Sequence, residues 1–131
     1  MKHLLDTNIC IALLKNNDLN LVKKMQEHAP DDFFLCSIVK AELIFGARKS
    51  QSVDKNLLLL SKFFAHFSSV PFDDNSAEYY GVNRAILEKL GQPIGEADLL
   101  ISSIALANNY TVITRNHREF IRIPGLKVEV W

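Results

Sequence analysis

The sequence has little cysteine and no recognisable metal-binding arrangement of histidine. Two cysteines, Cys10 and Cys36, occur in 131 residues, too few for a disulfide framework or a cysteine-based zinc site. Both lie among apolar neighbours, so we expect buried, reduced thiols. Zinc-ligand spacing is also absent from the four histidines, which are His3, His28, His66 and His117.

Long apolar runs and an excess charge are missing as well. The densest apolar patch, residues 57–60, is far shorter than the roughly 18 residues of a membrane span. An acid at position 6 comes too early for a signal peptide. We therefore expect a cytoplasmic protein that does not bind membranes. The 15 basic and 15 acidic residues balance, which excludes a polycationic nucleic-acid coat but leaves room for a local basic patch.

The composition is that of an ordinary folded protein. Hydrophobic residues make up 48% and charged residues 23% of the chain, which argues against disorder. At roughly 150 residues per domain, the length predicts one domain over residues 1–131. A chain of this size buries about two-thirds of its unfolded surface, so it folds without covalent staples.

Short apolar runs alternate with helical patterns along the chain. Strands are predicted at residues 2–5, 33–36, 68–72, 111–114 and 127–130. Helices are predicted at residues 9–14, 19–28, 37–48, 53–67, 77–90 and 96–108, with a short turn or helix at 115–120. Pro71 cannot donate to a strand ladder, so 68–72 is expected at an edge. The alternation predicts an α/β/α sandwich with a mostly parallel sheet of four to five strands.

Acidic and amide side chains follow the predicted strands or begin the next helices. They are Asp6, Glu42, Asp98, Asn116 and Glu119. Sites in parallel sheets form beyond the carboxyl ends of the strands, and we expect these residues to meet there. Carboxylate oxygens are the ligands that Mg²⁺ and Mn²⁺ prefer, and such ions promote phosphodiester cleavage.

Each acid also has a structural interpretation. Asp6 is a plausible helix N-cap, and Asp98 is a first-turn acid favoured by the helix dipole. Glu119 can be a surface acid paired with Arg115 or Arg122. No one of these acids identifies a site by itself.

Glu42 lies in a segment that we expect to be mostly buried, because Leu43, Ile44 and Phe45 follow it. An acid in a buried segment usually has a partner or a chemical role.

Basic residues cluster near the proposed edge. Residues 114–122 contain three arginines and His117 against one acid, and further cations end two predicted helices. Such a rim suits phosphate binding around an acidic centre, although solvated charges at helix C-termini are the alternative. The rim consists of Lys15, Arg48, Lys49, Arg115, Arg118 and Arg122.

These motifs, in this order, resemble the PIN-domain ribonucleases, and most closely the VapC toxins of bacterial type II VapBC toxin–antitoxin pairs. The resemblance covers nearly the whole chain. It rests on Leu4-Leu5-Asp6-Thr7-Asn8, Ser37 with Glu42-Leu43 and Gly46, Gly95-Glu96-Ala97-Asp98, Thr114-Arg115-Asn116 with Glu119-Phe120, and the ending from Ile123-Pro124-Gly125-Leu126 to Trp131.

The resemblance implies a PIN-like fold and an endoribonuclease that uses Mg²⁺ or Mn²⁺. The family's three core acids map onto Asp6, Glu42 and Asp98 as metal ligands. Its fourth acidic position falls on Asn116, which is a departure, and Glu119 is the expected replacement acid. The remaining positions that match the motifs are expected to support the site, and these are Thr7, Asn8, Thr114 and Asn116.

The resemblance further implies a homodimer and a cognate VapB-type antitoxin whose tail enters the acidic groove. The toxins most similar to this chain cut initiator tRNA in its anticodon stem-loop, so tRNA is the expected RNA. Arg115 and Arg118 are expected to contact flanking phosphates. Two other readings are a catalytically silent PIN-like interaction module and a receiver-like phosphoacceptor domain.

Overall fold

A computed structural model describes all 131 residues of the chain. Its five strands are β1 (His3–Leu5), β2 (Phe33–Cys36), β3 (Ser68–Val70), β4 (Thr111–Thr114) and β5 (Val128–Val130). Its helices are α1 (Thr7–Lys15), α2 (Leu19–Gln26), α3 (Ser37–Arg48), α4 (Val53–Phe64), α5 (Asp74–Lys89), α6 (Glu96–Asn108) and α7 (His117–Phe120). A short 3₁₀ turn, η1 (Pro30–Asp32), precedes β2.

Every predicted strand and helix is confirmed, and the differences are confined to element ends. The helix predicted at 53–67 ends at Phe64, because turn bonds to the carbonyls of Phe63 and Phe64 follow it. The helix predicted at 77–90 begins three residues earlier, since Asp73 caps it by accepting from the Ser76 amide at 2.9 Å. Sequence patterns locate elements better than they locate ends.

The sheet is parallel throughout, with strand order β3-β2-β1-β4-β5. The prediction of a mostly parallel sheet of four to five strands is thus confirmed, and β3 is an edge strand as Pro71 indicated. A receiver-like domain would follow the order 2-1-3-4-5, so that alternative is wrong. The direction of strand addition reverses between β1 and β4, which is where parallel sheets place their ligand sites.

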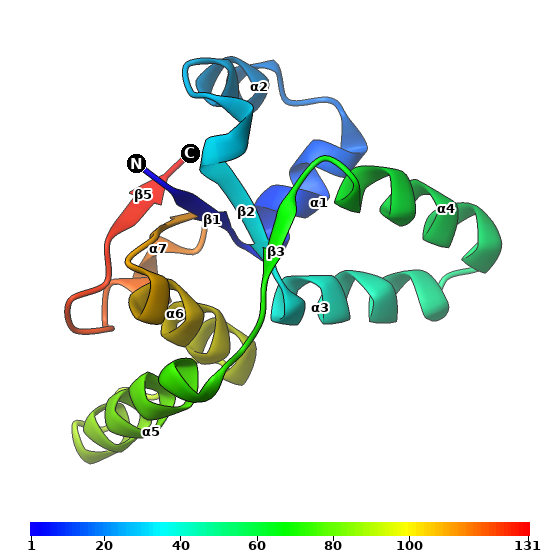
Figure 1. Cartoon of the computed structure of the whole chain (residues 1–131). Coiled ribbons are helices and arrows are strands. Elements are labelled where there is room, and N and C mark those ends of the chain that lie inside the picture. Colours follow the sequence, from blue (N-terminus) through cyan, green and yellow to red (C-terminus); the bar gives the residue numbers. More distant parts are fainter.

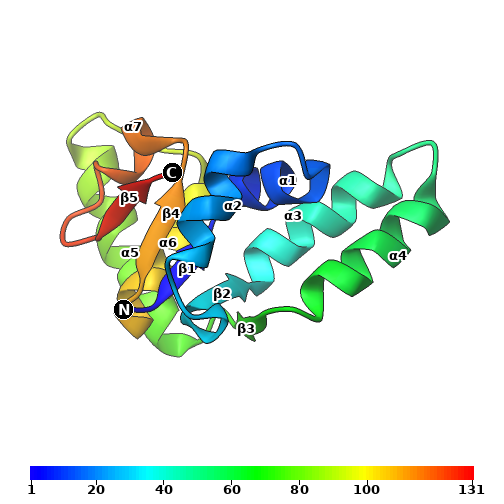
Figure 2. The ribbon, with the colours of Figure 1, turned by 90° about the horizontal axis from the view of Figure 1, so that it is seen from above.

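The sheet is covered on both sides (Figure 1). Helices α1 and α2 lie over one side, and α5 and α6 lie over the other (Figure 2). Cys10 and Cys36 are free and fully buried, as expected. None of the helices is both long and apolar enough to cross a lipid bilayer. The largest side chains of the core include Leu4, Leu5, Ile9, Leu35, Ile101, Ile104, Ile113 and Phe120.

Helices α3 and α4 form a pair that extends beyond the sheet (Figures 1 and 2). Only one stripe of α3 is buried, at Val39, Leu43 and Ala47. The expectation of a mostly buried segment around Glu42 is therefore wrong, since Ile44 is 39% and Phe45 64% exposed. The projecting position of the pair explains this, because only the inner stripe of α3 meets other elements.

A buried histidine lies in an aromatic cluster at the start of β1. The His3 ring packs against His28, Phe33 and Trp131, with ring centroids 4.7, 5.4 and 5.6 Å away. It is fully buried, and neither ring nitrogen has a hydrogen-bond partner. Burial, followed by the nearby His28, lowers the pKa of His3. The carboxylate of Glu129, 3.8 Å from Nε2, opposes this effect only partly.

Replacing His3 with Phe should make the free energy of unfolding depend less on pH in the acidic range. Because the pKa of His3 is lowered in the folded state, protonating it favours the unfolded state. The free energy of unfolding is therefore highest above the unfolded pKa of about 6.5. As the pH decreases below that value, it decreases by up to about 1.4 kcal/mol per pH unit. Urea unfolding at pH 7.5, 6.5 and 5.5 measures this slope. His3→Phe should lose less stability over this range than the wild type. The control is His66→Gln, since His66 is exposed, and an unchanged slope in His3→Phe contradicts the interpretation.

Candidate active site

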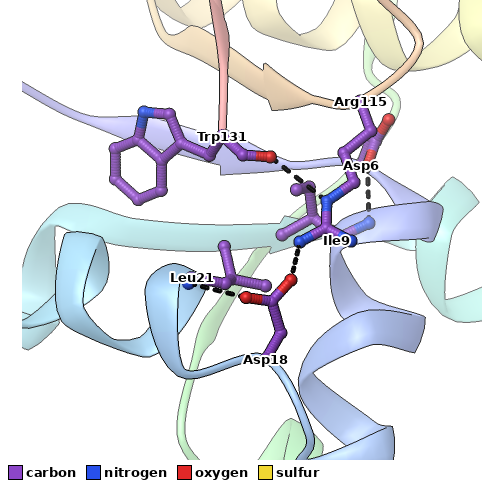
Figure 3. Close-up of polar contacts among 6 residues, drawn as sticks. All are labelled: Asp6, Ile9, Asp18, Leu21, Arg115 and Trp131. Atoms are coloured by element: carbon purple, nitrogen blue, oxygen red, sulfur yellow. Dashed lines mark hydrogen bonds and ion pairs between the residues drawn. The ribbon is translucent and has the colours of Figure 1, made fainter.

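The centre of the candidate site is Asp6, which comes directly after β1. Its Oδ1 accepts a hydrogen bond from the Ile9 amide at 2.9 Å and so caps α1 (Figure 3). Its Oδ2 accepts from the hydroxyl of Thr114 at the end of β4. The residue is only 3% exposed. Burial raises its pKa, and the neighbouring carboxylate of Glu42 adds to the rise, while the bonds from Thr114 and Ile9 oppose it.

Strand register explains why Asp6 meets a residue 108 positions away. Leu5 pairs with Ile113, and the amide of Asp6 continues the ladder by donating to the Ile113 carbonyl at 3.1 Å. Asp6 and Thr114 therefore lie opposite each other at the carboxyl edge of the sheet.

Asn116 connects this edge to two further acids. Its amide N–H donates to the Thr114 hydroxyl at 2.7 Å. Its side-chain Nδ2 donates to Asp98 at 3.0 Å and to Glu119 at 3.3 Å. Five of the residues expected from the sequence are thus joined in one hydrogen-bonded network, which consists of Asp6, Asp98, Thr114, Asn116 and Glu119.

Asp98 and Glu119 are close enough to share a proton. Burial, followed by the hydrogen bond and the charge of Glu119, raises the pKa of Asp98 to about 7. The pKa of Glu119 is lowered, chiefly by the same hydrogen bond from Asp98. Because the pKa of Asp98 is raised and that of Glu119 is lowered, Asp98 is the one that holds the proton near neutral pH.

Glu42 faces the site from α3 but is exposed. It accepts a hydrogen bond from the hydroxyl of Thr7, in the first turn of α1. The backbone amide of Asn8 donates to Asp6, while the Asn8 side chain is exposed. As the side chains lie, no three acidic, histidine or cysteine groups converge on a point that could hold a metal ion.

A groove begins at Glu42 and Thr7 and continues between α1, α3 and α4. Its volume is about 450 Å³. Lys15 and Asn56 contribute polar groups to it. Most of the lining is apolar, from Ile11, Leu14, Leu43, Ala47, Leu59 and Leu60.

The basic residues do not all face the acids. Arg115 is bonded to Asp18 and to the carbonyl of Trp131. Arg118 and His117 are exposed on α7. The Arg122 guanidinium donates to the Pro93 carbonyl at 3.1 Å and contributes a positive charge near Glu119.

Two other cations of the predicted rim lie at the far end of the projecting pair. Lys49 packs its amine over the Phe45 ring, 5.1 Å from the centroid, and Arg48 is exposed in the last turn of α3.

Two contacts at or near the candidate site were not predicted from the sequence. The backbone amide of Gly95 donates to Glu119, and a Cβ at Gly95 would lie 3.6 Å from a Glu119 oxygen. The glycine-rich loop before α6 was the available signal. The ion pair between Asp18 and Arg115 joins residues that are 97 positions apart in the sequence, so no local sequence pattern predicts it.

Comparison with known proteins places the chain in a family. The family model described as the PIN domain matches residues 3–126. The chain belongs to the PIN-domain family.

Its relatives lie in the VapC branch of that family. "Ribonuclease VapC2" of Rickettsia felis is 39% identical over 137 residues, covering 100% of this chain and 98% of that protein. "tRNA(fMet)-specific endonuclease VapC" of Shigella flexneri is 34% identical over 131 residues, with the same coverage. The crystal structure of VapBC2 from Rickettsia felis bound to a promoter DNA fragment contains a chain that superposes with a TM-score of 0.93 at 35% identity, covering 100% of this chain and 99% of that one. The resemblance to PIN-domain VapC proteins is confirmed.

In this PIN-domain chain, Asp98→Asn should stabilise the protein without metal. An acid whose folded pKa is raised destabilises the fold above its unfolded pKa of about 4, and the cost grows until pH about 7. Asparagine mimics the protonated acid, since it can accept from Asn116 and donate to Glu119. Thermal unfolding in EDTA should show a melting temperature higher by roughly 3 °C or more at pH 8.

The gain in the Asp98→Asn variant should shrink toward pH 5. Glu96→Gln is the matched control, because Glu96 is also in the first turn of α6 but is exposed. It should not raise the melting temperature. If the Asp98→Asn variant melts at or below the wild-type temperature at pH 8, the result contradicts the claim that burial and neighbouring carboxylates make ionised Asp98 destabilising.

Proposed function

We propose that the chain is a metal-dependent endoribonuclease, folded as one domain over residues 1–131, and the toxin of a VapBC-type pair. One observation supports this most strongly. Asp6, Asp98 and Glu119 come from three separate elements and are joined through Thr114 and Asn116 at the point where the sheet reverses its direction of strand addition. The names of the VapC relatives point to the same activity.

The donor set fits a hard divalent cation. Asp6, Glu42 and Asp98 offer carboxylate oxygens, and no histidine or cysteine accompanies them, which favours Mg²⁺ or Mn²⁺ over zinc. The raised pKa of Asp98 results from burial and from the negative groups around it. A cation would compensate this excess negative charge. We assign Asp6, Glu42 and Asp98 as its ligands and Glu119 as the fourth acid.

When bound, the cation would supply an activated water and stabilise the phosphate for in-line hydrolysis, with a 5′-phosphate and a 3′-hydroxyl as products. The residues of the chain prepare the site. Thr114 and Ile9 fix both oxygens of Asp6. The side-chain amide of Asn116 donates a hydrogen bond to Asp98 and another to Glu119, and so fixes both carboxylates. These bonds set the positions of the carboxylates before substrate binds.

Glu42 is held more loosely, because it is exposed and has one partner, Thr7. Arg118 lies on α7 directly before Glu119, and its side chain is exposed. We assign it to a flanking phosphate.

For the substrate we propose initiator tRNA, cut in its anticodon stem-loop. The name of the Shigella flexneri relative states tRNA(fMet) specificity. A net charge of zero suits selective binding, since it provides little sequence-independent attraction to phosphate. The shape of a folded RNA loop must then supply the selectivity.

For the partners we propose a VapB-type antitoxin and a second copy of the chain, with all of them in the cytoplasm. The structural neighbours are VapBC complexes. The apolar groove beside Glu42 suits a protein segment. A homodimer is supported by α5 and its C-cap residue, where exposed apolar side chains follow helical spacing at Tyr79, Val82, Ile86 and Leu90.

An RNA-cleavage assay tests the activity and its substrate together. Purified protein is incubated with initiator tRNA or an elongator tRNA in Mn²⁺, Mg²⁺ or EDTA. We expect cleavage of initiator tRNA in the anticodon stem-loop with either metal and none in EDTA. Asp6→Asn should reduce the rate by about 100-fold or more. It should still fold, because asparagine is also a good N-cap.

Asp73→Asn is the matched control, since Asp73 caps α5 in the same way but lies outside the site. It should cleave at the wild-type rate. Cleavage in EDTA, or normal cleavage by Asp6→Asn, contradicts the metal-dependent nuclease. Equal cutting of both tRNAs contradicts the substrate only. If no RNA is cut while an antitoxin still binds, the chain is a silent interaction module.

A further inference from the structure

Arg115 lies in the chain between Thr114 and Asn116, the two residues whose hydrogen bonds connect the acids of the candidate site. Thr114 donates to Asp6, and Asn116 donates to Asp98 and Glu119. The Arg115 side chain reaches Asp18 at the start of α2 and Trp131 at the end of the chain (Figure 3). Its Nε donates to the carbonyl of Trp131 at 3.1 Å, and its Nη2 donates to the carboxylate of Asp18. We call these three residues, Asp18, Arg115 and Trp131, the clamp.

Asp18 is a fixed partner for the arginine. It caps α2 by accepting from the Leu21 amide at 3.0 Å (Figure 3). Its other oxygen receives the Arg115 guanidinium. The Leu21 bond, followed by the Arg115 contact, lowers the pKa of Asp18. The carboxylate is therefore ionised at neutral pH and held by the helix end as well as by the arginine.

The last residue holds the same turn from the backbone. The amide of Trp131 donates to the Thr114 carbonyl at 3.3 Å, while its own carbonyl accepts from Arg115. Trp131 thus contacts two consecutive residues of the 114–116 turn. Its ring stacks on His28, with centroids 5.3 Å apart, which fixes this end of the chain against the segment after α2.

We propose that Asp18 and Arg115 are positioning residues of the nuclease site, which act by fixing the turn from Thr114 to Asn116. The expectation that Arg115 grips an RNA phosphate fits this geometry less well, because its guanidinium already has an anionic and a carbonyl partner. The role in catalysis rests on the proposed function. The effect on the turn does not depend on it.

The first test compares Arg115→Met and Asp18→Asn with Arg84→Met and Asp73→Asn. Asp18→Asn keeps the N-cap of α2 and removes the charge that holds Arg115. Arg84 forms an exposed pair with Glu88 on α5 at 3.0 Å, and Asp73 caps α5 without an arginine. The two controls therefore match the loss of a surface ion pair and the change at a helix cap.

We expect Arg115→Met to lower kcat by about 10- to 100-fold, with KM changed by less than about twofold. Asp18→Asn should have a smaller effect in the same direction, and Arg115→Lys should fall in between, since lysine keeps the charge but not the forked donors. Both controls should match the wild type. A raised KM with normal kcat, together with a shallower salt dependence of RNA binding, would instead assign Arg115 to a phosphate.

A second readout needs no activity. The side-chain amide of Asn116 gives its own pair of signals in ¹⁵N–¹H spectra of the protein without RNA. Arg115→Met and Asp18→Asn should shift or broaden that pair, and the two controls should leave it in place. Unchanged Asn116 signals in both clamp variants overturn the proposal. If the wild type cuts no RNA, the proposed function fails, but this readout still decides the role of the clamp.

Discussion

The hydrogen bond from Thr114 to Asp6 joins the carboxyl ends of the two central strands, and the other features of the site depend on that junction. Parallel pairing of β1 with β4 brings the two residues together across 108 positions of sequence. The same carboxylate starts α1 by capping it. The same hydroxyl accepts from the Asn116 amide, from which the network extends to Asp98 and Glu119. The bond between Thr114 and Asp6 therefore links the register of the sheet, the start of α1 and the positions of the acids.

This arrangement works against folding. Burial raises the pKa values of Asp6 and Asp98, with like charges adding to the effect, so ionising either residue costs stability. The core of the sheet and the backbone ladder offset that cost. Sites built from crowded carboxylates commonly trade stability for function in this way. The exposed Glu42 avoids most of the burial cost.

Much of this could be predicted from sequence because the signals are local. Apolar runs locate all five strands, and Asp6 was expected as the N-cap of the first helix. The rule for parallel sheets then brings Asp6, Asp98 and Asn116 to one edge. The exposure of Ile44 and Phe45 could not be foreseen, because it depends on how far the α3–α4 pair extends from the sheet. The partner of Arg115 was equally hidden, since a surface arginine has the same appearance in sequence whether it binds a carboxylate or RNA.

The central claim is that these acids form a cation site, and thermal unfolding with added Mn²⁺ tests it most directly. Ligands that bind only the folded state stabilise it by mass action, by about 2.7 kcal/mol at a concentration 100 times Kd. Mn²⁺ should therefore raise the melting temperature of the wild type above its value in EDTA. The Asp98→Asn variant should gain little or nothing from the metal. An equal rise in both proteins, or no rise in the wild type, would contradict the account.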